Sequence, residues 1–207
     1  MHSASVLQTV LPSLPRITLH GYWSRAIGFH HLKNPPPGAP PGSPPQPLWP
    51  GSPATRGARF TPKGGFGSVY LASDPVTALM EVVAVFANPY GAAFTLRTHP
   101  WTLVAVDGVL LEILDLTNAG IQASLGTTVA ELTGDWAYIQ STGGTPPTQL
   151  LGQEAFATGS ILGLQYHSAK NLGKGIGVVV FSDRLTMMPP SSLEVVDPFL
   201  NLNQKLP

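Results

Sequence analysis

Residues 57–81 read GARFTPKGGFGSVYLASDPVTALME and place Arg59, Tyr70 and Glu81 at regular intervals of eleven residues. Glycine and proline on both sides of Arg59 predict a loop, and the apolar run at residues 68–72 predicts a short strand that carries Tyr70. The Asp-Pro pair that follows predicts the start of a helix, which places Glu81 near the end of that helix. Three consecutive elements therefore each carry one polar side chain, and these side chains are candidates for a shared pocket.

A segment rich in glycine, KGGFGS at residues 63–68, lies inside this stretch. Nucleotide fingerprints run strand, glycine loop, helix, because the helix N-terminus receives the phosphate. Here the glycines precede a strand, so neither a P-loop nor a dinucleotide fingerprint is predicted. We interpret the glycines as turn residues; the alternative is that their backbone N–H groups hold a pyrophosphate beside Lys63 and Arg59.

Charge is scarce in this chain and unevenly distributed. Of its 207 residues, 43% are hydrophobic and 11% are charged, against about 25% charged in a typical domain. The net charge is zero, yet residues 1–73 carry six Lys or Arg and no Asp or Glu. A zero total argues against non-specific nucleic-acid binding. The acid-free segment is compatible with a local basic pocket for a small phosphorylated ligand.

Several classes of protein are excluded or disfavoured by what the sequence lacks. The absence of cysteine rules out disulfides, thiolate catalysis and Cys-ligated metals. The histidines form no HExxH frame, so no catalytic metal is expected, and no GxSxG elbow indicates a serine hydrolase. The N-terminus does not resemble a signal peptide, and no apolar window is long enough to span a bilayer. We therefore expect a cytoplasmic protein with no membrane association.

The N-terminal part is predicted to hold one strand and one irregular segment. Residues 17–27, ITLHGYWSRAI, are aromatic and β-prone, which predicts a first strand with Arg25 near its end. Residues 34–56 follow and are dominated by proline over most of their length. This density of proline is incompatible with regular secondary structure, so a loop of polyproline-II type or a disordered insert is predicted.

The rest of the chain predicts a mixed architecture. After an apolar, β-branched run at residues 81–86, strand character is found in four later runs, at residues 101–107, 109–114, 161–167 and 176–182. The first two flank Asp107-Gly108, which is a two-residue hairpin signal. Residues 117–157 are more helical, and a proline pair at 146–147 predicts the start of a helix there. The predicted fold class is therefore α+β, as one mixed domain over residues 1–207 with a central sheet.

The order of short motifs along the chain resembles the core of the RES domain, a family named for its Arg, Glu and Ser. Arg-aromatic-x-Pro-x-Gly at residues 59–64 is followed by Tyr-Leu-Ala at 70–72 and by Ala-Leu-x-Glu at 78–81. The segment GLQYHSAK at residues 163–170 resembles the late segment of that family, which ends in Ser-Ala-Arg, with Ser168 as its serine.

The resemblance covers residues 17–182 and includes departures from the family pattern. An arginine on the first strand is usual in the family, and Arg25 fits it. Thr61 stands where the family commonly has Asn, and Lys170 replaces its final Arg. The Pro-rich insert also lengthens the distance between the first strand and Arg59.

The resemblance implies a fold and an activity. RES proteins are similar in fold to the diphtheria-toxin type of ADP-ribosyltransferase, and they act on NAD. Many are toxins that a cognate antitoxin holds inactive, and they degrade NAD or ADP-ribosylate a protein. For this chain the resemblance implies NAD as the substrate and an antitoxin as the partner.

The resemblance also implies a role for each candidate residue. Glu81 would hold the hydroxyls of the nicotinamide-side ribose and stabilise positive charge at its anomeric carbon. Tyr70 would stack on the nicotinamide or the ribose, and Ser168 would bind the ligand or orient Glu81. The pyrophosphate would be neutralised by three basic side chains, namely Arg25, Arg59 and Lys63.

The chemistry and the class of protein both leave alternatives open. One carboxylate suffices to cleave NAD, because nicotinamide departs as a neutral base and needs no proton, unlike the leaving group of most glycosidases. The acceptor is open between water, phosphate and a protein side chain, which correspond to a glycohydrolase, a phosphorylase and an ADP-ribosyltransferase. A different class is a noncatalytic interaction module that retains the fold and binds another protein through its cleft or Pro-rich loop.

Overall fold

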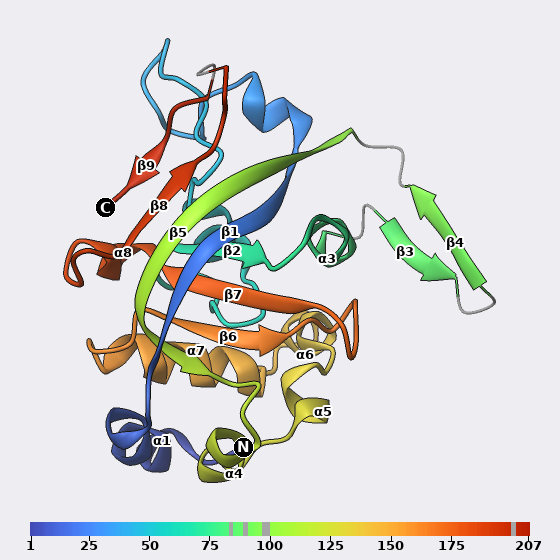
Figure 1. Cartoon of the computed structure of the whole chain (residues 1–207). Coiled ribbons are helices and arrows are strands. Elements are labelled where there is room, and N and C mark those ends of the chain that lie inside the picture. Colours follow the sequence, from blue (N-terminus) through green and yellow to red (C-terminus); the bar gives the residue numbers. More distant parts are fainter. Residues whose placement is uncertain (83–84, 89–90, 97–99, 200–201) are drawn as a thin grey trace.

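The computed structural model describes residues 1–82, 85–88, 91–96, 100–199 and 202–207 (Figure 1). Its strands are β1 (Ile17–Gly28), β2 (Ser68–Ala72), β3 (Val85–Asn88), β4 (Gly91–Leu96), β5 (Trp101–Asp115), β6 (Gly163–His167), β7 (Ile176–Phe181), β8 (Ser192–Val195) and β9 (Lys205–Leu206). Its helices are α1 (Ala4–Val10), α2 (Gly51–Arg56), α3 (Pro75–Glu81), α4 (Ala119–Ser124), α5 (Val129–Leu132), α6 (Trp136–Ser141), α7 (Pro147–Ala157) and α8 (Ser182–Leu185), with 3-10 turns η1 (Leu11–Ser13) and η2 (Phe29–Leu32). None of the helices in the described ranges is long and apolar enough to cross a membrane.

A mixed sheet lies at the centre of the molecule, with strand order β1-β2-β7-β6-β5-β8-β9. Only β5 and β6 pair in parallel within it. β1 also pairs with β5, from Ile17 opposite Ile113 to Gly28 opposite Trp101. The strands β1, β2, β7, β6 and β5 therefore form a closed ring of paired strands. Figure 1 shows the long strands β1 and β5 crossing over β2, β7 and β6. This arrangement confirms one mixed domain with a central sheet.

The central strand β7 is buried on both faces, since side chains alternate across a strand. Val178 and Val180 belong to a core between β7 and the long strands β1 and β5. Val179 and Phe181 belong to a second core, to which α7 contributes Leu151. Each such side chain, fully buried, contributes about 1.5–3 kcal/mol to stability. The predicted strands at 161–167 and 176–182 are therefore confirmed as core elements β6 and β7.

Helix α3 forms where the sequence predicts it. Asp74 is the N-cap residue, and its Oδ1 accepts the Thr77 N–H at 2.8 Å. Pro75 takes the first helical position, where its missing N–H costs no hydrogen bond. The helix packs on β1 and β2 and ends at Glu81. The predicted start of α7 at the proline pair is also confirmed, at Pro147.

The hairpin predicted at Asp107-Gly108 is wrong, because β5 runs through both residues without a turn. Gly108 lies opposite Gly21 of β1 and Leu193 of β8. A Cβ on Gly108 would stand 3.2 Å from the Leu193 side chain and 3.3 Å from that of Trp23. The glycine therefore permits close packing between strands, and pairing with two neighbours outweighs the local turn signal.

The Pro-rich segment predicted as a loop over residues 34–56 ends earlier than predicted. Residues 51–56 form α2, and Pro53 is tolerated because it lies in the first turn, where N–H groups have no partner inside the helix. The part before α2 is also anchored: the Leu48 side chain is fully buried, and its N–H donates to Gln204 Oε1 at 2.7 Å. The insert is therefore built into the wall of the domain.

Gly152 of α7 provides a test of the packing behind the site, since a Cβ there would approach the Phe60 carbonyl oxygen to 1.9 Å. We predict that Gly152→Ala lowers the free energy of unfolding by about 1–3 kcal/mol, because the backbones must separate. In an ordinary helix interior the same change stabilises by about 0.5–1 kcal/mol. Urea unfolding measures the effect, with the exposed neighbour Gln153→Ala as the control. A more stable Gly152→Ala variant would contradict this packing.

Candidate active site

A cavity of about 530 Å³ lies between β1, β2, α3, β6 and the connection from α5 to α6. Four of the six predicted site residues line it: Arg25, Arg59, Tyr70 and Glu81. Ser168 is fully buried and donates a hydrogen bond to Glu81, although it is not itself among the described lining residues. Lys63 is exposed on the loop before β2 and is not among the described residues that line the cavity. The structure thus brings five of the six residues together and leaves Lys63 outside.

Ser168 fixes the carboxylate of Glu81. Its hydroxyl donates to Glu81 Oε1 at 2.5 Å. The Ser168 Oγ itself accepts the backbone N–H groups of Lys170 and Asn171, at 3.2 Å and 3.0 Å. A serine hydroxyl has one proton and two acceptor positions, so the two N–H groups leave its proton directed at Glu81. Of the two roles predicted for Ser168, this geometry corresponds to orienting Glu81.

The loop that carries Ser168 is tied to the start of α3. Asn171 Nδ2 donates to Thr77 Oγ1 at 2.8 Å, and Thr77 Oγ1 donates to Asp74 Oδ2 at 2.6 Å. Burial raises the pKa of Asp74, but the hydrogen bonds from Thr77 outweigh it, and the net shift is downward. The N-cap is therefore ionised at neutral pH. The position of Glu81 is thus fixed through both ends of its helix.

Arg59 connects the cavity to the helices beyond it. Its side chain is 7% exposed, and its Nη1 donates to the carbonyl oxygens of Leu132 at 2.8 Å and Gly134 at 2.9 Å. Leu132 is the last residue of α5, where its carbonyl has no partner inside the helix and favours a positive charge. Gly134 follows the helix, and its carbonyl also accepts the Trp136 N–H at 3.0 Å. Arg59 therefore has a structural contact that sequence reasoning did not predict.

Tyr70 presents a fixed ring to the cavity. Its hydroxyl accepts the Phe60 N–H at 3.0 Å and lies 3.0 Å from Thr61 Oγ1. Burial raises the pKa of Tyr70 to about 12, although the hydrogen bonds and the charge of Arg59 partly offset that rise. The phenol is therefore neutral at physiological pH. It lines the cavity in this state and carries no negative charge.

Arg25 reaches the cavity from β1 and has unused hydrogen-bonding capacity. Its Nη2 donates to the Trp49 carbonyl at 3.2 Å, whereas its buried Nη1 has no hydrogen-bond partner among the described residues. Burial lowers the pKa of Arg25 to about 10, so the guanidinium stays protonated at neutral pH. A buried cationic donor without an acceptor is costly unless a ligand supplies one.

Asp135, Trp136 and Tyr166 are among the further lining residues that the sequence did not single out, and Lys170, noted there only as a departure from the family pattern, lines the cavity as well. Burial, and then the charge of Glu81, raise the pKa of Tyr166. Asp135 caps α6 by accepting the Tyr138 N–H at 3.1 Å, a role that its place before an apolar helix could have indicated. No local signal places these residues beside Glu81. Within the described ranges, no group of three or more His, Asp or Glu side chains is arranged to hold a metal ion.

The fold and the site together define a class: a mixed α/β domain that brings one glutamate, a serine that orients it and two arginines to a single cavity. The family follows from comparison with known families, because residues 35–195 match the model of the RES domain. The match spans most of the chain, so this protein belongs to the RES domain family, as its motifs predicted.

A solved structure with a similar fold comes from the "Crystal structure of the M.tuberculosis MbcT-MbcA toxin-antitoxin complex". The two chains share 20% sequence identity with a TM-score of 0.62, and the match covers 95% of this chain and 94% of that one. At this identity the likeness is one of fold. A search of curated proteins found no significant match.

Because Arg59 donates to two carbonyl oxygens, we predict that its removal destabilises the fold, whether or not Arg59 also binds a ligand. Arg59→Ala leaves the Leu132 carbonyl without its side-chain donor and the Gly134 carbonyl with only the Trp136 N–H, and we expect the free energy of unfolding to fall by about 1.5–3 kcal/mol. Chemical denaturation of the ligand-free protein measures the loss. Arg56→Ala, at an exposed position, is the matched control and should change stability by less than about 0.5 kcal/mol. Equal stability of the two variants would show that the hydrogen bonds of Arg59 do not stabilise the fold.

Proposed function

We propose that this protein cleaves the bond between nicotinamide and ribose in NAD. The observation that carries the proposal is the Glu81 carboxylate, which lines the cavity and is held by a buried serine hydroxyl at 2.5 Å. Membership of the RES domain family supports it, because proteins of this family generally degrade NAD. An orienting hydrogen bond to a carboxylate in a cavity is the kind of preorganisation that catalysis requires.

The proposed step uses one carboxylate and no acid. The C–N bond to the pyridinium breaks, and nicotinamide leaves as a neutral base with the bonding electron pair. Positive charge develops on the ribose, and Glu81 stabilises it while accepting hydrogen bonds from the ribose hydroxyls. An oxygen of the acceptor then bonds to the same carbon and releases its proton to solvent. The acceptor is water, phosphate or a protein side chain.

The other cavity residues support binding of the rest of the substrate. Arg25 offers its unpartnered Nη1 to a pyrophosphate oxygen, a charge-assisted contact. Tyr70 and Trp136 supply aromatic surfaces for the nicotinamide or the ribose. Arg59 adds positive charge beside them, although its Nη1 is committed to two carbonyl oxygens. Lys63, which the sequence suggested for the pyrophosphate, is not part of this proposal.

We also propose that the protein is a toxin, with an ADP-ribosyltransferase-like fold of the diphtheria-toxin type, that acts in the cytoplasm and pairs with an antitoxin. The similar solved chain comes from a toxin–antitoxin complex, which supports this partner class. Cell growth with and without a co-expressed candidate antitoxin addresses this part of the proposal. It is independent of the chemical test below.

Glu81→Gln tests the chemistry with little change in shape. We expect release of free nicotinamide from NAD to fall by about 100-fold to 1000-fold, because the variant loses the negative charge that opposes the developing cation. Release is measured by chromatography of the reaction mixture, and circular dichroism verifies folding. Glu194→Gln is the control, since Glu194 is an exposed carboxylate of β8 that pairs with Lys205 of β9. Undiminished release by Glu81→Gln, or none by the wild type, rejects the proposal.

Ser168→Ala tests whether Ser168 acts through Glu81 as a positioning residue. We expect kcat to fall by about tenfold to 100-fold with little change in KM, because a misdirected carboxylate affects the reacting state more than ground-state binding. Steady-state kinetics separates the two constants, and Ser160→Ala, an exposed serine before β6, is the control. A change in KM alone would show that Ser168 serves substrate binding instead.

A further inference from the structure

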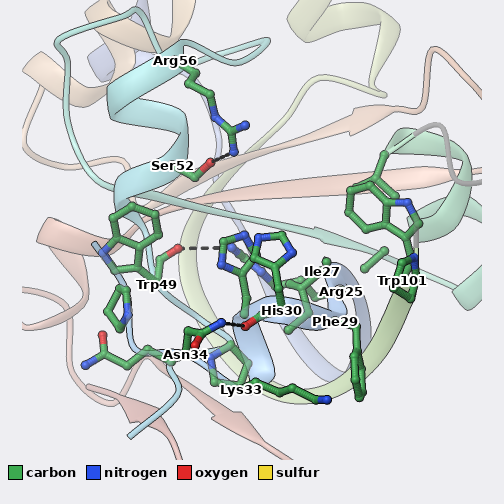
Figure 2. Close-up of a pocket in the computed structure, with 18 residues that line it drawn as sticks. Arg25, Ile27, Phe29, His30, Lys33, Asn34, Trp49, Ser52, Arg56 and Trp101 are labelled. Carbon is green, nitrogen blue, oxygen red and sulfur yellow. Dashed lines mark hydrogen bonds between the residues drawn. The ribbon is translucent and has the colours of Figure 1, made fainter. Parts of the chain in front are cut away.

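A second cavity, of about 920 Å³, adjoins the first. It lies between the end of β1, η2, the Pro-rich insert, α2 and the start of β5 (Figure 2). The two cavities share four lining residues, Arg25, Ala26, Ser52 and Val82. A ligand that enters both is therefore elongated, and Arg25 lies at the junction.

The second cavity is lined by positive charge. Its basic and histidine side chains are Arg25, His30, His31, Lys33 and Arg56. Its described lining includes no Asp or Glu, and residues 1–73, which supply most of it, contain none. Burial lowers the pKa of His31, and the nearby charges of His30, Arg56 and Arg25 lower it further. His31 is therefore mainly uncharged at neutral pH, and the cations of this cavity are Arg25, Lys33 and Arg56.

The walls also hold buried donors that lack acceptors. Arg25 Nη1 and Trp101 Nε1 have no hydrogen-bond partner among the described residues. Both groups are donors only. A cavity with cations and spare donors and without a carboxylate in its described lining is complementary to a ligand rich in anionic oxygens, such as a phosphate ester.

Aromatic side chains supply the remaining recognition surface. Trp49 and Trp101 both line the cavity, and Figure 2 shows them on opposite sides of Arg25 and His30. Flat aromatic faces beside cations are suited to a purine base that carries phosphate groups. An adenosine with phosphate on its ribose combines the two requirements.

We propose that the second cavity binds the adenosine half of the substrate together with a phosphate on its ribose 2′-oxygen, so that the protein acts on NADP in preference to NAD. This inference rests on the proposed function. In Rossmann-type sites an acidic residue binds the free 2′-hydroxyl of NAD and arginine accommodates the 2′-phosphate of NADP, and the same charge chemistry applies to a cavity of another fold. Here the described lining supplies Arg56 and Lys33 and no acid. Arg25, at the junction, is placed for the pyrophosphate.

Binding measurements test the site without requiring catalysis. Isothermal titration calorimetry of the full chain compares adenosine 2′,5′-bisphosphate with 5′-AMP, which differ only by the 2′-phosphate. We expect the bisphosphate to bind at least about tenfold more tightly, as charge-assisted hydrogen bonds predict. Equal affinity, no binding of either compound, or equally tight binding of inorganic phosphate alone would overturn the proposal.

Figure 2 shows Arg56 and Lys33 on opposite sides of Arg25 and His30, so a single phosphate meets one of the two, and the double variant Lys33→Ala with Arg56→Ala removes both candidates. We expect the preference for the bisphosphate to fall by about tenfold or more, and the ratio of kcat/KM for NADP over NAD to fall in parallel. Lys174→Ala is the matched control, because Lys174 is an exposed lysine outside both described linings. An unchanged preference in the double variant would overturn the assignment of these two residues.

The two proposals fail in different ways. If NAD releases nicotinamide and the 2′-phosphate adds neither affinity nor turnover, the second cavity is assigned wrongly and the proposed function stands. If the bisphosphate preference is found but neither dinucleotide loses nicotinamide, the proposed function fails and the binding site stands.

Discussion

The candidate site depends on one hydrogen bond, from the Ser168 hydroxyl to the Glu81 carboxylate. The two residues are 87 positions apart in the chain, so this bond joins elements that are distant in sequence. The serine is fully buried and its oxygen is occupied by two backbone N–H groups, which leaves a single direction for its proton. A carboxylate held in this way keeps one orientation toward the cavity before any ligand arrives, which lowers the cost of reorganisation.

The sheet topology explains why these two residues meet. β2 and β6 are both antiparallel neighbours of β7, so they run in the same direction and end at the same edge. Ala72 at the end of β2 and Tyr166 near the end of β6 both lie opposite Gly177. α3 follows β2, and the loop with Ser168 follows β6. The packing also requires glycine at position 177, because a Cβ there would stand 2.5 Å from the ring of Tyr166.

Local features of the site were predictable from the sequence because local chemistry determines them. The Asp-Pro start of α3, the short apolar strand β2 and the late position of Glu81 each follow from neighbouring residues. Contacts over long distances were not predictable: Arg59 meets the end of α5, and Asp107-Gly108 lies within a strand because β1 and β8 pair on either side of it. The motif order nevertheless identified the family, since it requires residue types and spacing but no knowledge of contacts.

The fold places the acid-free part of the chain and the first acidic residues at different cavities. The acid-free N-terminal segment forms most of the second cavity, whereas the first carboxylate of the sequence, Asp74, begins the helix that ends at Glu81 in the first cavity. Under the proposed function this separation has a physical consequence. A dinucleotide with a cationic nicotinamide at one end and phosphates toward the other would be oriented by the protein's field, with the pyridinium toward Glu81 and the phosphates toward Arg25. Reversing the ligand would place like charges together at both ends, so the same distribution that keeps the net charge at zero would select one binding direction.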